Sequence, residues 1–369
     1  MQSRFKAAAI LGALASAGSV VALFACSSSN QATTTPDASS STSTSSSTTS
    51  SSSSSAVDAS TTDSSVSDAS PSDATVTPTF LAYFGDGGPK PEGLWRVGDA
   101  DTPIVGLATL ASLVTLTPDG GTQAFGLIGD GGATNNSLTL GITTDTAGNV
   151  YIGVAAVPVD AGNVPPPGVY RFPPDGGAGT LFSSSPQMNF ANGFDFIGAQ
   201  LYVADSYGYV FSIAPDGGAA VWSSDPLLAP DAAGCDAAVP LGVGANGIVN
   251  DSNNVYVTNT NFGRLIQIPI ESDGGAGTPT AIVNSCSLVG ADGLVIDTTN
   301  NTFLIALNIQ NAIARVALDG GTSIIASGGL LNTPASVVID TSTGTRRLLF
   351  TNATFFSGSD PGVLTIPLP

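Results

Sequence analysis

The stretch Ala245–Thr260, ANGIVNDSNNVYVTNT, decides the fold because its pattern recurs along the chain. It contains a short apolar segment, a turn rich in Asp, Asn and Ser, and a second segment in which apolar and polar residues alternate. Alternation with a period of two is typical of β-strands, and Asp and Asn favour tight turns. The same features recur, in the same order, in the segments 138–154, 191–206, 291–307 and 334–352. Each copy therefore predicts two consecutive strands joined by a short turn.

A second motif, an apolar strand that ends in Asp-Gly-Gly, lies between these copies. Asp-Gly supplies the positive φ angles that tight hairpins need. The motif recurs at intervals of 41 to 57 residues. Two hairpins in each unit of this length predict four-stranded propeller blades. The aspartates of the motif are Asp119, Asp175, Asp216, Asp273 and Asp319.

The two ends of the globular part complete the pattern. GVLTIPLP, from Gly362, reads as the third strand of a last unit, and FLAYF, from Phe80, can supply the missing fourth strand. This closure predicts an all-β fold, a six-bladed β-propeller over residues 80–369, with seven blades as the alternative. An irregular β-sandwich or β-helix is a further alternative that the strand spacing disfavours.

The N-terminus has the layout of a secretory signal. Two basic residues precede an uncharged run of small and apolar residues from Ala7 to Ala25. Residues 23–26, LFAC, resemble the lipobox of bacterial lipoproteins, which implies that residues 1–25 are a signal peptide and that Cys26 is lipidated. The alternative is an uncleaved transmembrane helix, because the run is nearly long enough to span a bilayer.

Residues 26–79 begin with Cys26 and then consist almost entirely of Ser, Thr, Ala, Asp and Pro. Such a segment cannot bury enough apolar surface to offset its ordering entropy, so we expect a disordered tether. Ser27, by resemblance to other lipoproteins, indicates the outer membrane. The expectation is thus an exported monomer that contacts the membrane only through its lipid anchor.

Composition restricts the chemistry. The chain after Cys26 has 28 acidic residues against seven Lys and Arg, a formal charge of −21. This charge argues against binding to nucleic acid, which needs clustered cations. The sequence contains no His, which excludes Ser-His-Asp and Cys-His mechanisms and imidazole metal sites. Any chemistry must use carboxylates, amides, hydroxyls, backbone groups or a metal bound by oxygen.

The copies quoted above resemble the blades of NHL and SMP-30/gluconolactonase-like six-bladed propellers, most clearly in ANG…LYVADS. One position in each copy lies just before the first strand and is expected to face the central channel. In register, this position holds Leu140, Asn192, Asn246, Asp292 and Ala335, and PEGLWRV adds Glu92.

In the SMP-30-like lactonases, Glu, Asn and Asp at such positions hold a divalent cation. The resemblance implies that Glu92, Asn192, Asn246 and Asp292 bind a cation, with calcium the first candidate. It also implies that Asp292 acts as the base in lactone hydrolysis. Two observations leave a purely structural interpretation open. GLWRV also matches GVYRF at Gly168, a third strand, and that register would take Glu92 away from the channel. Asn-Gly and Asp-Gly are also common turn dipeptides.

Cys235 and Cys286 both lie in connections that lead into the first strand of a new unit. Such connections share one face of a propeller, so we expect a disulfide after export, one that ties down the insertion Asp225–Val239. The alternative is two free thiols.

Two functions follow from these observations. The first is a binding or scaffold module without catalysis, whose ligand is a protein, a glycan or a small molecule. The second is a metal-dependent lactone hydrolase. Convergence of Glu92 with Asn192, Asn246 and Asp292 would favour the second.

Overall fold

The computed structural model describes residues 75–97, 102–129, 137–156, 165–231, 234–235 and 242–369. These residues form the strands β1 to β24 and one short 3-10 helix, η1 (Cys286–Leu288). The predicted signal peptide, Cys26 and nearly all of the tether lie outside the described residues.

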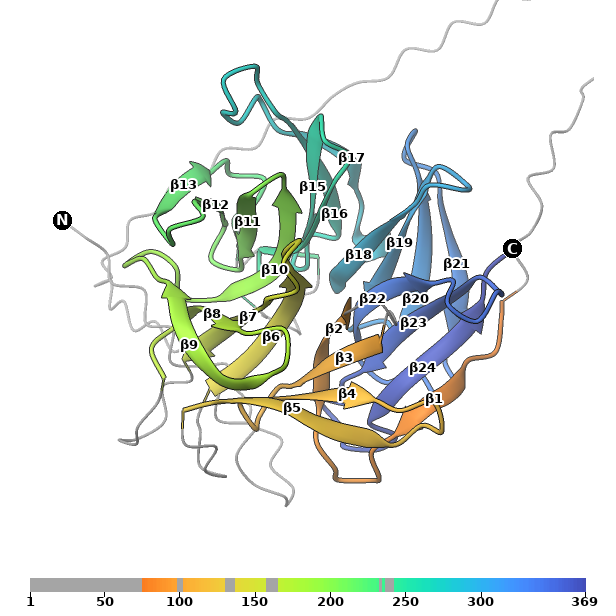
Figure 1. Cartoon of the computed structure of the whole chain (residues 1–369). Helices are drawn as coiled ribbons and strands as arrows, with labels where there is room; N and C mark the ends of the chain where they lie inside the picture. The colour runs from red at the N-terminus through yellow and green to blue at the C-terminus, as the bar shows by residue number, and fades with distance from the viewer. Residues whose placement is uncertain (1–74, 98–101, 130–136, 157–164, 232–233, 236–241) are drawn as a thin grey trace, which may run out of the picture. The chain divides into compact units, whose positions relative to one another are not determined.

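Strands that follow one another in the chain pair antiparallel and build three sheets in simple chain order (Figure 1). The first sheet contains β10 (Ala191–Ile197), β11 (Gln200–Asp205), β12 (Tyr209–Ile213) and β13 (Ala219–Ser223). The second contains β14 (Ala245–Asn250), β15 (Asn254–Asn259), β16 (Arg264–Pro269) and β17 (Thr280–Asn284). The third contains β18 (Ala291–Asp297), β19 (Thr302–Leu307), β20 (Ala312–Ala317) and β21 (Thr322–Ser327). These are the strand pairs and Asp-Gly-Gly hairpins that the repeats predicted.

A fourth sheet joins the two ends of the described chain. It contains β22 (Pro334–Asp340), β23 (Arg347–Asn352), β24 (Gly362–Pro367) and β1 (Thr79–Tyr83). β1 pairs antiparallel with β24, so that Thr79 lies opposite Thr365 and Tyr83 opposite Gly362. This pairing confirms that the N-terminal strand completes the last unit.

The remaining strands form one eight-stranded sheet that the sequence did not predict. Its order is β2-β3-β4-β5-β9-β8-β7-β6, two antiparallel runs joined by a parallel pairing of β5 with β9. A Cβ on Gly126 would lie 2.6 Å from the ring of Phe172 and 2.8 Å from the carbonyl oxygen of Gly177, so the pairing requires that Gly126 carry no side chain. The strands are β2 (Pro91–Val97), β3 (Thr102–Leu107), β4 (Ser112–Leu116), β5 (Thr122–Ile128), β6 (Ser137–Thr144), β7 (Val150–Ala156), β8 (Gly168–Phe172) and β9 (Gly177–Ser183).

The first strands of the chain-order groups surround a common axis. β2, β6, β10, β14, β18 and β22 contact one another in this order, and β22 contacts β2 again. Apolar clusters fill the space between neighbouring sheets: Tyr256 of β15 packs on Phe303 of β19, with ring centroids 4.7 Å apart. This arrangement is an all-β propeller.

The Asp-Gly-Gly hairpins make contacts between neighbouring four-stranded groups as well as turns. A Cβ on Gly176 would lie 2.1 Å from the carbonyl oxygen of Phe125, and one on Gly217 would lie 2.4 Å from that of Phe182. Gly274 differs, because a Cβ there would have no described atom within 4 Å. At that hairpin the contact is a hydrogen bond of 2.9 Å from Trp222 Nε1 to the Gly274 carbonyl. The motif therefore supplies both the positive φ of the turn and the close approach of neighbouring four-stranded groups.

Candidate functional site

Each innermost strand has an irregular register near its start. In β14, for example, Ala245 pairs with Asn259 but the next pair is Ile248 with Val257, so Asn246 and Gly247 form a bulge. Bulges redirect side chains, here toward the axis. The predicted site residues all lie at or inside such irregularities. Each is the second residue of its strand, whereas the sequence placed it just before the strand. They are Glu92 in β2, Asn192 in β10, Asn246 in β14 and Asp292 in β18.

The glycine that follows each site residue is required by the neighbouring strand. A Cβ on Gly193 would lie 2.3 Å from the carbonyl oxygen of Asn246, and one on Gly247 would lie 2.4 Å from that of Asp292. Gly141 follows Leu140, which holds the equivalent position in β6. A Cβ on Gly141 would lie 2.0 Å from the carbonyl oxygen of Asn192. The Asn-Gly and Asp-Gly pairs are therefore packing sites at the axis, and their interpretation as ordinary turn dipeptides is wrong.

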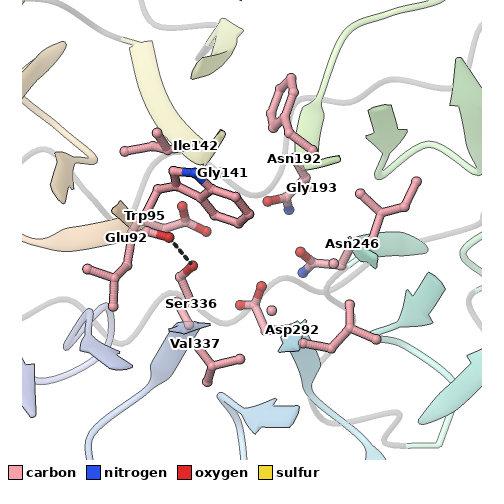
Figure 2. A pocket seen from close by; sticks show the side chains of 17 residues that line it. Glu92, Trp95, Gly141, Ile142, Asn192, Gly193, Asn246, Asp292, Ser336 and Val337 are labelled. Carbon is pink, nitrogen blue, oxygen red and sulfur yellow. Dashed lines mark hydrogen bonds between the residues drawn. The ribbon is translucent and has the colours of Figure 1, made fainter. Parts of the chain in front are cut away.

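The side chains of Glu92, Asn192, Asn246 and Asp292 line one cavity on the axis. Figure 2 shows their carboxylate and amide groups pointing toward a common centre. All four are buried, with at most 5% of the residue surface exposed. β2 is the innermost strand of its run, so the alternative in which PEGLWRV is a third strand is wrong.

The cavity has a volume of about 50 Å³. A single water needs roughly 10–15 Å³ on this measure, so the space suits a cation with a few waters. Further along the channel the walls become apolar, with Leu94, Phe194, Ile248 and Leu294 two residues beyond the polar side chains. Trp95 also lines the cavity, and its Nε1 donates a hydrogen bond of 3.1 Å to Thr144 Oγ1.

Three further polar residues orient the site side chains. Asn192 Nδ2 donates to Ser206 Oγ at 3.2 Å, and Asn246 Nδ2 donates to Thr260 Oγ1 at 2.9 Å. With these nitrogens engaged, the amide oxygens remain available to a ligand. Asn308 Nδ2 donates to Asp292 Oδ2 at 2.9 Å.

Sequence reasoning missed Ser206, Thr260 and Asn308, although the repeats contained a signal for them. Each comes directly after the second strand of its unit, at the same position of three successive copies.

Burial dominates the electrostatics of the two carboxylates. Removal from water raises the pKa of Glu92 well above its usual value, and the charge of Asp292 raises it further. Burial also raises the pKa of Asp292, although hydrogen bonds from Asn308, Asn246 and the Gly293 amide oppose this shift. Glu92 Oε2 is buried and has no hydrogen-bond partner among the described residues. An unpaired buried carboxylate oxygen beside a second carboxylate is costly, and either a proton or a bound cation relieves this cost.

The donor set fits a hard cation. Calcium prefers carboxylate and amide oxygens, and the cavity offers two carboxylates and two amides. Within the described parts of the chain, no three His, Cys, Asp or Glu residues lie together so as to hold a metal. The amide oxygens of Asn192 and Asn246 would thus have to complete any coordination shell.

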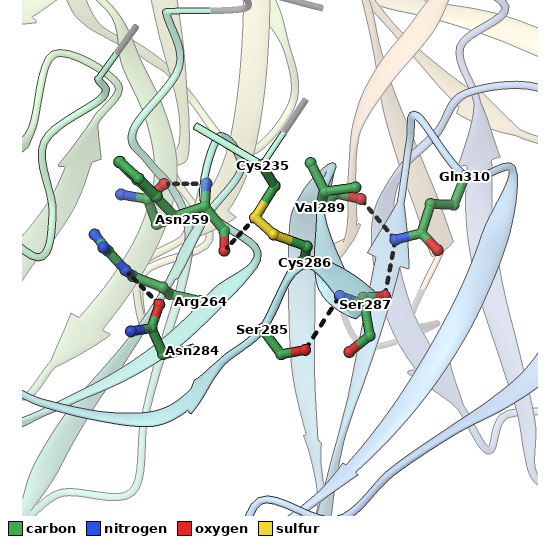
Figure 3. Close-up of a disulfide and its surroundings, with 10 residues drawn as sticks. Cys235, Asn259, Arg264, Asn284, Ser285, Cys286, Ser287, Val289 and Gln310 are labelled. Atoms are coloured by element: carbon green, nitrogen blue, oxygen red, sulfur yellow. Dashed lines mark hydrogen bonds between the residues drawn. A yellow bond between two sulfur atoms is a disulfide. The ribbon is translucent and has the colours of Figure 1, made fainter. Parts of the chain in front are cut away.

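Cys235 and Cys286 form a disulfide, with their Cα atoms 5.2 Å apart (Figure 3). Cys286 begins η1, where Ser285 Oγ accepts a hydrogen bond from the Ser287 amide. Gln310 Nε2 donates to the carbonyls of Ser287 and Val289, both at 2.8 Å. The bond links the segments before β14 and β18. Parts of the predicted insertion, residues 232–233 and 236–241, lie outside the described residues.

None of the helical segments in the described ranges is long and apolar enough to cross a membrane. No protein-family model and no curated protein sequence matches the chain.

Solved propeller structures do resemble it. A calcium-binding protein, regucalcin, from Agrobacterium tumefaciens aligns with 15% identity and a TM-score of 0.57, over 79% of this chain and 95% of that one. A gluconolactonase from Xanthomonas campestris has 15% identity and a TM-score of 0.57, over 80% and 90%. The PQQ-bound aldose sugar dehydrogenase of Streptomyces coelicolor has 13% identity and a TM-score of 0.52, over 79% and 98%. At these identities the likeness shows the fold alone.

Proposed function

We propose that the chain is a metal-dependent lactone hydrolase of the SMP-30/gluconolactonase-like type, with calcium as the first candidate cation. The observation that carries this proposal is the buried, unpartnered Glu92 Oε2 in one cavity with Asp292, Asn192 and Asn246. The fold neighbours described as a calcium-binding regucalcin and a gluconolactonase support it. In this proposal the eight-stranded sheet counts as two blades, which gives a six-bladed propeller.

Glu92 and Asp292 would hold the cation through carboxylate oxygens, and Asn192 and Asn246 through amide oxygens. A bound divalent cation polarises a carbonyl group and lowers the pKa of water. Asp292 would accept the proton of the water that attacks the lactone carbonyl, and the ring oxygen would take up a proton when the acyl C–O bond breaks. Asn308 would orient the Asp292 carboxylate for this role.

We further propose that the propeller is exported and anchored through lipidated Cys26, on the outer membrane. The support is the signal-like N-terminus, the LFAC motif, the Ser27 that follows it and the Ser/Thr-rich segment after it.

Calorimetric titration of the purified whole chain with calcium tests the proposal. Wild-type protein should bind calcium, and Asp292→Asn should weaken binding by at least about tenfold. Asp319→Asn is a matched control, because Asp319 lies in a hairpin where it accepts a hydrogen bond from the Gly321 amide. The control should bind like wild type.

A screen of small lactones, including glucono-1,5-lactone, completes the test. Calcium-dependent hydrolysis that Asp292→Asn abolishes would support the enzyme. Calcium binding without hydrolysis would leave a cation-binding module. Absence of binding to calcium, zinc and manganese would overturn the proposal in favour of a scaffold.

A further inference from the structure

The ring of innermost strands is polar on one side and apolar on the other. The polar side is formed by β10, β14 and β18, which follow one another around the axis and carry Asn192, Asn246 and Asp292. The flanking strands β6 and β22 hold Leu140 and Ala335 at the equivalent position, where they are 3% and 0% exposed. Between β22 and β6 lies β2, which carries the glutamate of the site.

The backbone contacts confirm that Leu140 and Ala335 are equivalent to the polar site residues. A Cβ on Gly93 would lie 2.2 Å from the Leu140 carbonyl oxygen, and one on Gly293 would lie 2.7 Å from that of Ala335. The carbonyls of the two site asparagines and of the site aspartate approach a glycine of the preceding strand in the same way. Both apolar residues therefore occupy a place that three other strands give to a polar side chain.

The residues behind this ring show the same division. Ser206, Thr260 and Asn308, which orient the site side chains, each follow the residue that pairs with the start of the innermost strand. In the units of β2 and β22 the corresponding residues are Ala108 and Ala353, both 0% exposed. On the apolar side, these positions therefore lack the hydroxyl and amide groups that the polar side has.

Two aromatic residues lie over the apolar side. Phe190 and Phe355 are half-buried and pack on a buried apolar cluster that includes Leu138 and Leu140. Phe190 directly precedes β10, and the Phe355 amide donates a hydrogen bond of 2.8 Å to Thr333 Oγ1, which directly precedes β22. Both rings therefore lie at the end of the propeller where the innermost strands begin, which we call the mouth of the cation cavity.

Neighbouring groups hold the two rings in place. Lys90 Nζ donates a hydrogen bond of 3.2 Å to the Phe355 carbonyl and lies 6.0 Å from the centroid of the Phe355 ring. The Phe190 ring meets Tyr207 edge-on with centroids 6.2 Å apart, and the Phe190 amide donates to Asp205 Oδ2 at 2.8 Å. Because these contacts fix the rings, a ligand does not have to order them when it binds.

We propose that the lactone hydrolysed at the cation cavity carries an apolar substituent, which lies against Phe190 and Phe355 at the mouth. This inference rests on the proposed hydrolase function. Water adds across the acyl C–O bond of such a lactone and releases a hydroxy acid. Each methylene group that moves from water onto an apolar surface strengthens binding by up to about fourfold. The hydroxyl groups of a sugar lactone would instead lose water on this side and gain few partners.

Three lactones with the same six-membered ring test the role of the substituent. They are δ-valerolactone, which has none, δ-decalactone, which has a pentyl chain, and glucono-1,5-lactone, which has hydroxyl groups. Each kcat/KM of the calcium-loaded whole chain is divided by the rate constant of hydrolysis by hydroxide, which removes differences in intrinsic reactivity. The normalised value for δ-decalactone should exceed those for the other two lactones at least about tenfold.

The variant Phe190→Ala separates contact with the substituent from general damage. It should lower kcat/KM for δ-decalactone by at least about fivefold and that for δ-valerolactone by less than about twofold. Phe182→Ala is the matched control, because Phe182 is also half-buried and has an aromatic partner, Tyr151, but belongs to β9, the outermost strand of its run. The control should keep the wild-type preference.

Binding of two lactams gives a readout that does not depend on hydrolysis. 6-Pentylpiperidin-2-one and piperidin-2-one have the shapes of δ-decalactone and δ-valerolactone but resist hydrolysis. Calorimetric titration of calcium-free wild-type protein should show at least about tenfold tighter binding of the pentyl compound. This comparison needs no variant, so it remains decisive if Phe190→Ala does not fold.

The outcomes distinguish this inference from the proposed function. Hydrolysis of δ-valerolactone or glucono-1,5-lactone at a normalised rate equal to or above that of δ-decalactone would overturn the inference and leave the hydrolase proposal intact. Equal losses in Phe190→Ala and Phe182→Ala, or equal binding of the two lactams, would do the same. Hydrolysis of none of the three lactones would overturn the proposed function, and this inference with it.

Discussion

A Cβ atom on Gly247 would lie 2.4 Å from the carbonyl oxygen of Asp292, so these two residues set how closely β14 and β18 approach. Thr258 Oγ1 donates to the same carbonyl at 2.7 Å. The backbone of a site residue is thus positioned by the neighbouring sheet. The same relationship links Gly193 to Asn246, which makes the ring of inner strands a mutually supported frame for the cavity.

Gly247→Ala should therefore lower the free energy of unfolding by about 1–3 kcal/mol, since the added methyl group has to displace backbone. Chemical denaturation measures the loss. Ser336 occupies the corresponding place in β22 and already carries a Cβ, so Ser336→Ala should cost less than about 1 kcal/mol. Equal losses in the two variants would show that the close approach is not what requires glycine.

Gly176→Ala and Gly274→Ala should separate the strain of the turn from the close contact with a neighbouring strand. Both glycines have a φ of 83°, so both substitutions incur the left-handed penalty of about 1–2 kcal/mol. Gly176 alone lies against a neighbouring carbonyl, that of Phe125. Its variant should lose a further 1–3 kcal/mol or so in denaturant unfolding. A difference near zero would mean that the Asp-Gly-Gly glycines serve only the turn.

Thr260→Val should weaken calcium binding about tenfold, because the hydroxyl that accepts from Asn246 Nδ2 is lost and the amide is free to turn. Isothermal titration measures the affinity. Ser183→Ala removes a comparable buried hydroxyl, which donates to the Gly217 carbonyl and does not line the cavity. That variant should retain the wild-type affinity, and a similar loss in both would argue against an orienting role for Thr260.

Asp340 should contribute to stability above pH 4 and lose this contribution in acid. Burial alone would raise its pKa, but hydrogen bonds from Ser342 and the nearby Arg347 and Arg96 lower it to about 2. A folded-state pKa below the unfolded value means that unfolding takes up protons, so stability falls as the pH drops from about 4 toward 2. Asp340→Asn should be less stable than wild type by about 2 kcal/mol at pH 7, and this difference should shrink near pH 2.

Asp205 should have the opposite effect. Burial raises its pKa to about 6, more than the amide hydrogen bonds from Phe190, Tyr207 and Asn189 lower it. Its contribution is therefore fully present below pH 4 and is lost as the pH rises through 6. Unfolding curves of wild type and Asp205→Asn between pH 4 and 7 test this: the wild type should lose on the order of 2–3 kcal/mol relative to the variant across that range. Parallel curves would contradict the prediction.

Removal of the Cys235–Cys286 disulfide should destabilise the propeller. The bond closes a loop with a sequence separation of 51 residues, for which loop-closure entropy gives an upper estimate of about 4 kcal/mol. The double variant Cys235→Ala/Cys286→Ala should unfold at lower denaturant concentration. Reduction of the wild type should reproduce this shift, and it should have no effect on the double variant.

Much of the fold could be predicted because its information is local. The strand pairs, the Asp-Gly-Gly hairpins and the closing strand at Phe80 follow from alternation and turn chemistry within short segments. The repeats also placed Asn192, Asn246 and Asp292 at equivalent positions, and they indicated Glu92 as one of two possible registers. The parallel pairing of β5 with β9 could not be predicted, because it depends on the approach of Gly126 to Gly177.

By itself, the sequence determined that this protein is a histidine-free, strongly acidic chain whose repeated strand pairs form a propeller. Local periodicity and turn residues carry that information. The tertiary structure alone decided that Glu92 faces the axis, that glycines separate the inner strands, and that apolar side chains gather on one side of the cavity mouth. These features arise from contacts between different sheets, and no local pattern specifies how closely two distant strands approach.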